Sequence, residues 1–264
     1  AMRGHEVILY EKSTALGGLL PLASIVKGSH PEDLSLIINY FSNQLRKLGV
    51  KVELGKEADM SVIDALKPDV VFLATGATST IPKIPGIDHP KVVSGVALHQ
   101  KLKFALKFFK PETLRKLTKF YLPLGKKVVV IGGAIQGCEL AEFLAKRGRE
   151  VTVVETSDMI GEHMVDAMLA NLMTWFQKKG VRLVSGVKEY VEITDKGLTI
   201  INKEGKQETI YADSIATALP LTSNDELLEN LKAKVPEVYP IGDCREPLLI
   251  ADAIGTGLRT AREV

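Results

Sequence analysis

Between Lys126 and Thr156 the chain reads KKVVVIGGAIQGCELAEFLAKRGREVTVVET. The apolar run VVVI predicts a buried strand, the glycines after it predict a tight turn, and GCELAEFLAK predicts a helix. A second apolar strand, EVTVV, ends at Glu155. Strand, glycine turn, helix and strand in this order predict a dinucleotide-binding βαβ unit.

The turn itself follows the pattern G-x-A-x-x-G, with Gly132, Ala134 and Gly137 at the three marked positions. The first residue makes the turn, the second lets the backbone approach a pyrophosphate, and the third lets helix and strand pack closely. Alanine at the second position adds a methyl group that loosens or shifts the phosphate, so a folded but empty unit is the alternative. The predicted cofactor-binding residues here are Gly132, Gly133, Ala134, Ile135, Gln136, Gly137 and Glu155.

An acid at the tip of the second strand accepts hydrogen bonds from an adenosine ribose and repels a 2′-phosphate. Glu155 has this position, and Thr156, Ser157 and Asp158 after it offer no cation to attract such a phosphate. The unit is therefore expected to bind NAD(H) in preference to NADP(H).

The sequence at the end of this unit is repeated near the start of the chain. RGREVTVVET, from Arg147 to Thr156, matches RGHEVILYEK, from Arg3 to Lys12. Only two residues precede the earlier copy in this sequence, so the earlier copy contains the second strand of a unit without its first strand or glycine turn. The pattern predicts two dinucleotide-binding units, of which one is incomplete.

The remaining chain alternates strands and helices, which predicts an α/β fold with two Rossmann-like, doubly wound, three-layer domains. Predicted strands cover 6–10, 50–54, 69–74, 181–184, 213–219 and 238–242, with helices at 33–49, 61–66, 166–179 and 248–262. Period-2 runs at 189–193, 198–202 and 208–211 predict a small antiparallel layer. The expected domains are an incomplete dinucleotide-binding domain (1–97 plus 214–264), a basic amphipathic connecting segment (98–126) and an NAD(P)H-binding domain (127–213).

The amino-acid composition bears on the kind of protein and on its cellular environment. The 264 residues are 45% hydrophobic and 25% charged with a net charge of +2, which is typical of a globular protein and gives no overall attraction to nucleic acid. No apolar run reaches the ~20 residues of a membrane span. Cys138 and Cys244 lie far apart without metal-ligand or C-x-x-C spacing, so no metal site or redox disulfide is predicted and a reducing cytoplasm is expected.

Four segments carry a family resemblance: LYEKSTALGG (9–18), FLATGA (72–77), VVVIGGAIQGCELAEFLAKRG (128–148) and YPIGDCREPLLIADAIGTGLRTAREV (239–264). The chain resembles the C-terminal FAD/NAD(P)-binding region of the 2,4-dienoyl-CoA reductase, 2-enoate reductase and trimethylamine dehydrogenase family of NADH:flavin oxidoreductases. The resemblance implies that the incomplete domain (1–97 plus 214–264) is of the FAD type. It implies FAD-binding roles for Glu11, Lys12, Gly17, Gly18, Thr75, Gly76, Gly242, Asp243 and Ala251.

The resemblance also implies a longer parent protein. Members of this family carry a strand and G-x-G-x-x-G turn ahead of this region, and before that a barrel with FMN and an iron-sulfur cluster. The expected function is the electron-input module of such an oxidoreductase, which passes hydride from NADH to FAD and onward to reduce an enoyl- or dienoyl-type substrate. FAD is expected to bind weakly or not at all to this chain alone, which is then inactive, and no catalytic residue is assigned in it.

Two other functions stay open: a structural nucleotide-binding module that holds ADP or nothing, and a stand-alone NADH oxidase. The basic segment at 98–126 also has several interpretations. In one interpretation the segment binds an acidic partner, a membrane surface or the phosphates of a CoA ester. In the other it packs on the absent domains and its lysines remain in solvent. The substrate and any homo-oligomeric state are not determined by the sequence.

Overall fold

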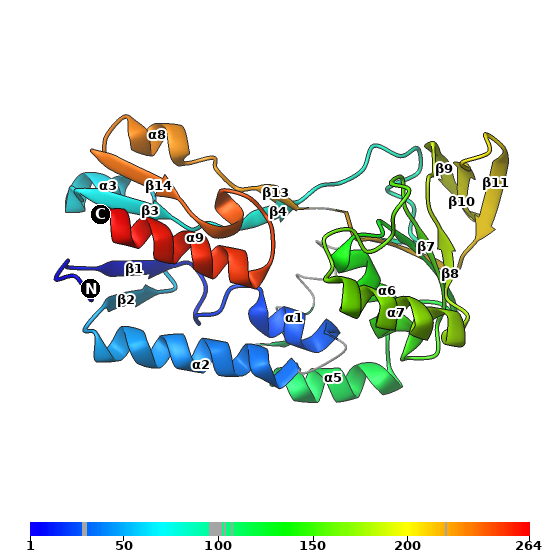
Figure 1. The fold of residues 1–264 in the computed structure, drawn as a ribbon, viewed down its shortest axis with the longest axis horizontal. Coiled ribbons are helices and arrows are strands. Elements are labelled where there is room, and N and C mark those ends of the chain that lie inside the picture. Colours follow the sequence, from blue (N-terminus) through cyan, green and yellow to red (C-terminus); the bar gives the residue numbers. More distant parts are fainter. Residues whose placement is uncertain (28–30, 95–101, 103, 107, 220) are drawn as a thin grey trace. The chain divides into compact units, whose positions relative to one another are not determined.

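The computed structural model describes residues 1–27, 31–94, 102, 104–106, 108–219 and 221–264. The chain forms two compact units (Figure 1). Unit 1 comprises Ala1–Gly18, Leu36–Thr80 and Leu221–Val264, and unit 2 comprises Leu19–Ser35 and Ile81–Pro220.

A five-stranded parallel sheet forms the centre of unit 2. Its strand order is β5 (Val92–Ser94), β12 (Ser214–Thr217), β6 (Lys127–Ile131), β7 (Glu150–Val154) and β8 (Arg182–Val184). Helix α6 (Ile135–Ala145) packs on β6 and β7, and the unit also contains α1 (Leu20–Val26), α5 (Pro111–Phe120) and α7 (Asp166–Lys179). Parallel order and an α-helical crossover between β6 and β7 confirm the predicted Rossmann-like architecture.

An antiparallel sheet of three strands adjoins this core within unit 2. It contains β9 (Glu189–Thr194), β10 (Gly197–Ile201) and β11 (Gln207–Tyr211), in the order β11-β10-β9. The period-2 pattern predicted these strands: Leu198 and Ile200, two residues apart on β10, lie on one face of the sheet and are fully buried.

The apolar run of β6 accounts for the packing of unit 2. Val128 and Val130 lie in one buried cluster, with Leu144 and Phe176, while Val129 and Ile131 lie in a second cluster on the other face of the sheet. Burial on both faces explains why this strand is continuously apolar and not alternating.

Unit 1 contains four parallel strands that form two separate pairs. β1 (Ile8–Glu11) pairs with β2 (Lys51–Leu54), and β3 (Val70–Leu73) pairs with β14 (Glu237–Pro240). In Figure 1 the two pairs appear on opposite sides of α9 (Ile250–Glu263). Within the described residues, no strand pairs with both β1 and β3, so the two pairs stay separate.

The other elements of unit 1 are short, apart from one helix. They are α3 (Met60–Leu66), α8 (Leu228–Lys232), the 3-10 turn η1 (Gly242–Cys244) and the antiparallel pair β4 (Ala77–Ser79) and β13 (Leu221–Ser223). The longer helix α2 (Pro31–Lys47) contributes residues to both units. The main buried cluster of unit 1 is small: Leu73, Leu231, Val235 and Cys244.

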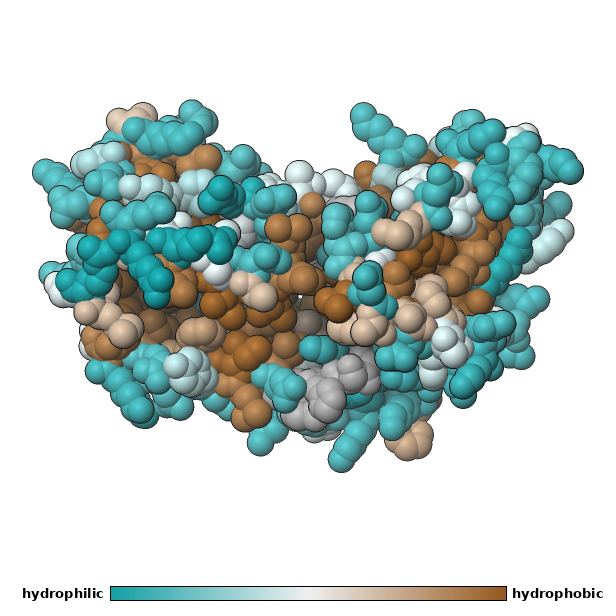
Figure 2. Space-filling view, in the orientation of Figure 1, coloured by the Kyte–Doolittle hydropathy of each residue, from teal (hydrophilic) through white to brown (hydrophobic). Residues whose placement is uncertain are grey.

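Apolar side chains remain exposed on unit 1. Leu249, Ile250 and Ile254, at the start of α9, each expose about two fifths of their surface, and Figure 2 shows apolar surface around these turns. Exposed apolar patches of this kind mark ligand-binding or protein-contact surfaces.

The predicted domain limits differ from the two units. β5 and β12 are strands of the unit 2 sheet, although residues 1–97 and 214–264 were assigned to the FAD-type domain. An apolar strand can join either sheet, and only long-range pairing selects one. The predicted boundary at 97 and part of the basic segment (98–101, 103 and 107) lie outside the described residues. No helix in the described part of the chain is long and apolar enough to cross a membrane.

Candidate dinucleotide and flavin sites

The glycine turn of unit 2 leaves no room for side chains at two positions. Gly132 has a φ of +106°, and a Cβ there would lie 2.4 Å from the carbonyl oxygen of Ala218. A Cβ at Gly137 would lie 1.9 Å from the carbonyl oxygen of Gly132. Glycine is therefore required at both positions for the turn to close on the helix behind it.

Glu155 ties the end of β7 to this turn. Its Oε2 accepts a hydrogen bond of 2.5 Å from the N–H of Gly133, and its Oε1 accepts one of 2.8 Å from the N–H of Ser157. A Cβ at Gly133 would approach the Cβ of Glu155 to 2.9 Å, so glycine is required here too. The carboxylate is thus positioned beside the turn before any ligand binds.

The N-terminus of α6 has free N–H groups. Ala134 is the N-cap residue, in an extended conformation, and no side chain caps the helix. The N–H groups of Ile135, Gln136 and Gly137 belong to the first turn, where no intrahelical acceptor exists. A close-packed glycine turn, uncapped N–H groups and a carboxylate at the next strand fit an NAD pyrophosphate and ribose.

Two ionisable groups near the turn are uncharged at neutral pH. Cys138 is fully buried, and burial, with smaller contributions from Glu139 and Glu155, raises the pKa of its thiol to about 12. Burial and then the charge of Glu155 raise the pKa of Tyr190 as well. The thiol of Cys138 therefore packs as a small apolar group.

The first group of predicted flavin residues lies at the end of β1 in unit 1. Glu11 accepts a 2.7 Å hydrogen bond at Oε1 from the N–H of Ser13, and Lys12 follows it in the chain. Gly17 has a φ of +118°, and a Cβ there would lie 2.8 Å from Cδ1 of Ile38. Gly18 has a φ of +54° with open space beside it.

The second group joins the end of β3 to η1. Thr75 donates from Oγ1 to the carbonyl oxygen of Asn224 at 2.6 Å and lies 3.3 Å from Sγ of Cys244, while Gly76 turns the chain with a φ of +76°. Cys244 also donates to the carbonyl oxygen of Asn224, at 3.1 Å. The sequence segments that contain FLATGA and GDC are therefore brought together by contacts that sequence spacing does not reveal.

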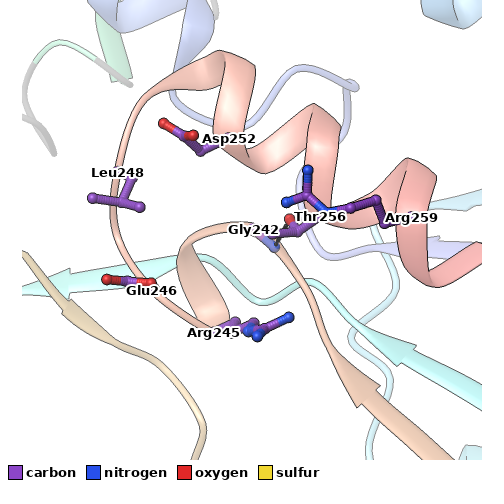
Figure 3. Close-up of a pocket in the computed structure, with 7 residues that line it drawn as sticks. All are labelled: Gly242, Arg245, Glu246, Leu248, Asp252, Thr256 and Arg259. Atoms are coloured by element: carbon purple, nitrogen blue, oxygen red, sulfur yellow. Dashed lines mark hydrogen bonds between the residues drawn. The ribbon is translucent and has the colours of Figure 1, made fainter.

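One residue of the third group, Gly242, lines a small pocket of about 200 Å³ (Figure 3). Gly242, with a φ of +58°, donates its N–H to Oγ1 of Thr256 at 2.9 Å. Arg259 reaches from α9 toward the same place. The lining residues are Gly242, Arg245, Glu246, Leu248, Asp252, Thr256 and Arg259.

Asp243 and Ala251 flank this pocket in sequence. Burial raises the pKa of Asp243, and a hydrogen bond from the backbone of Leu248 opposes that shift. Ala251 is exposed in the first turn of α9. Sequence reasoning missed Thr256 and Arg259, whose signal is their spacing of three residues along one helix face.

Unit 1 fits a flavin nucleotide only in part. Glu11 has the position of a ribose-binding acid at the end of a strand, and Gly242 has a left-handed φ of +58° where the chain turns from β14 toward α9. The seven residues before β1 contain no glycine turn that would hold a pyrophosphate. Among the described residues, no group of three or more His, Cys, Asp and Glu side chains could hold a metal ion.

Comparisons with known proteins agree with this architecture. The chain is 34% identical over 265 residues to an NADH oxidase of Thermoanaerobacter brockii, covering 100% of this chain and 38% of that protein. It is 29% identical over 273 residues to a cinnamate reductase of Clostridium sporogenes, covering 100% of this chain and 36% of that protein. The solved 2-naphthoyl-CoA reductase–2-naphthoyl-CoA complex has a TM-score of 0.82 and 31% identity, covering 100% of this chain and 37% of that one.

The chain therefore spans less than two fifths of the length of these relatives. A family model described as pyridine nucleotide-disulphide oxidoreductase matches residues 1–257. Both cysteines of this chain are free and buried. This match over nearly the whole chain shows that the protein belongs to the pyridine nucleotide-disulphide oxidoreductase family of FAD- and NAD(P)-binding oxidoreductases.

Proposed function

We propose that this chain is the electron-input module of a longer NADH-dependent flavoprotein reductase. The observation that carries the proposal is the glycine turn of unit 2 with Glu155 hydrogen-bonded to it, which matches the requirements of an NAD site. Unit 1 adds flavin-type elements at Glu11, Thr75 and Gly242. The relatives named as a cinnamate reductase and a 2-naphthoyl-CoA reductase support an enoyl- or dienoyl-type substrate for the longer protein.

When bound, NADH supplies a hydride and the flavin accepts it. The residues of this chain bind and orient: Gly132 makes the tight turn, Gly137 lets the helix pack closely against it, and Glu155 receives ribose hydroxyls. By resemblance, the onward path runs through an iron-sulfur centre to FMN in a barrel domain. We assign no proton donor or acceptor for substrate reduction to this chain.

Anaerobic titration of the full-length protein with NADH tests this proposal. We expect the flavin absorbance to bleach in proportion to added NADH, because hydride leaves NADH for the flavin. Intact flavin absorbance in a protein that still binds NADH would instead support a structural nucleotide-binding module. NADPH at the same concentration is the control.

A second candidate function is NADH oxidation with oxygen, favoured by the similarity to the Thermoanaerobacter brockii NADH oxidase. Oxygen consumption by this chain with FAD and NADH, in the absence of any other protein, would support that function. The electron-input proposal instead expects steady oxygen consumption to require the longer protein.

We also expect this chain alone to hold FAD weakly. No glycine turn precedes β1 in these residues, and in the described part of the chain β1 and β3 each pair with a single strand, so neither a pyrophosphate cradle nor a central strand of a flavin domain is found there. The purified chain should show little flavin absorbance and gain little after incubation with FAD and desalting. A yield near one FAD per chain would contradict this expectation. Protein with denatured unit 1, identified by circular dichroism, is excluded from the measurement.

A further inference from the structure

Unit 2 contains a second cavity, away from the glycine turn, with a volume of about 500 Å³. It lies at the C-terminal end of α6 and along α5, with one wall from α1. Its charged lining residues are Glu112, Arg115, Lys116, Lys119, Lys146 and Arg147. Five cations therefore face one carboxylate, in a cavity of the size that small-molecule sites have.

Arg147 is half-buried and has no carboxylate partner among its hydrogen bonds. Its Nε donates to Oγ1 of Thr118 at 3.1 Å, Nη1 donates to the carbonyl oxygen of Phe143 at 3.0 Å, and Nη2 donates to that of Arg115 at 3.2 Å. These neutral acceptors hold the guanidinium in a fixed position without cancelling its charge. A partly buried charge left in this way is costly, and a bound anion would relieve that cost.

The neighbouring cations add to this positive charge. Burial, and then the charge of Arg115, lower the pKa of Arg147 to about 10, which shows that the two guanidinium groups repel each other. Lys146 has its own partner, Glu142, at 2.6 Å. Within the described residues, no ion pair or hydrogen bond engages the side chains of Arg115, Lys116 and Lys119.

We propose that this cavity binds a phosphorylated small molecule through a diphosphate or similarly charged group. Phosphate oxygens form charge-assisted hydrogen bonds with guanidinium and ammonium groups, and a multiply charged group matches several unpaired cations at once. These cations line one concavity of about 500 Å³, which fits a compact anion better than an extended acidic protein surface. Helix α6 has 11 residues, a length of about 16 Å, and the cavity lies at the end opposite the glycine turn, so the two sites are separate.

The test is calorimetric titration of the whole chain with inorganic pyrophosphate at saturating NADH, which occupies the glycine turn. We expect one pyrophosphate per chain. The double variant Arg115→Gln/Lys119→Gln should weaken binding by about 10-fold or more, because it removes two of the cations. The matched control, Lys178→Gln/Lys206→Gln, removes two exposed charges of unit 2 outside the cavity and should change the affinity by less than about 2-fold.

Each remaining outcome decides the question. If both double variants weaken pyrophosphate binding equally, the binding depends on overall charge and not on this cavity. If no pyrophosphate binds when NADH is saturating, pyrophosphate and NADH compete for the glycine turn. Binding of an acidic peptide without binding of pyrophosphate would make this face a protein contact; all three results overturn the proposal. Unchanged NADH affinity confirms that the double variant is folded, and if it is not, Lys119→Gln alone, exposed on α5, should weaken pyrophosphate binding by about 3-fold.

Discussion

Replacing Gly137 by alanine should raise the Kd of NADH by about 100-fold or more, equivalent to about 2.7 kcal/mol. The added Cβ would lie 1.9 Å from the carbonyl oxygen of Gly132, and neither atom belongs to a flexible side chain. The backbone of the turn must therefore move, and overpacking of this kind costs about 1–3 kcal/mol before any ligand binds. Titration calorimetry with NADH measures the effect.

The matched control is Gly257→Ala in α9. A Cβ at Gly257 would meet Cδ1 of Ile241 at 3.7 Å, an ordinary contact, and alanine is favoured over glycine inside a helix. This variant should bind NADH with an affinity within about 2-fold of the wild type, since unit 2 is untouched. If the Gly137→Ala variant binds NADH as tightly as the wild type and its near-UV circular dichroism is unchanged, the glycine turn is not the NADH site.

Replacing Glu155 by glutamine should reduce the preference for NADH over NADPH from about 100-fold to about 10-fold or less. Glutamine retains a side-chain oxygen that can accept from the N–H of Gly133, so the turn keeps its support while the negative charge is lost. The charge is what repels a 2′-phosphate, so the affinity for NADPH should rise more than the affinity for NADH falls.

Glu204→Gln is the control for this charge change, because Glu204 lies exposed in the turn between β10 and β11. It should leave the ratio of the two affinities unchanged. If the wild type binds both nucleotides equally, or if Glu155→Gln leaves the preference intact, discrimination resides elsewhere and the assignment of Glu155 to the ribose is lost.

Long elements with a clear period were predictable from sequence. The helix expected at 166–179 is α7, with the same bounds, and the strands expected at 189–193, 198–202 and 208–211 are β9, β10 and β11 within a few residues. Local spacing of apolar residues determines such elements, since one face must be buried. The sequence does not predict helix α5, which lies in the basic segment, or the short elements α1, α8, β4, β5 and β13, although α3 and β8, which are as short, were predicted.

Some residues of the candidate sites were predictable from the sequence, and others were identified only from the structure. The glycines of the turn and the acid after β7 stand at fixed spacing along the chain, so sequence alone identified them. Thr256 beside Gly242, and Asn224 beside Thr75, come from segments whose proximity depends on the packing of unit 1. The cationic cavity shows this most clearly, since its lysines and arginines come from α5 and from the end of α6.

By itself, the sequence determined the class of this protein: a Rossmann-like unit with its glycine turn intact, and a second unit without one. Backbone sterics and burial act locally, so the residues that must be glycine or apolar reveal these features directly. Only the tertiary structure decided that β5 and β12 belong to the sheet of unit 2, that Glu155 hydrogen-bonds to the turn, and that Arg147 lies among unpaired cations. Strand pairing and charge clustering join residues distant in the chain, and their free energies depend on which partners the whole fold brings together.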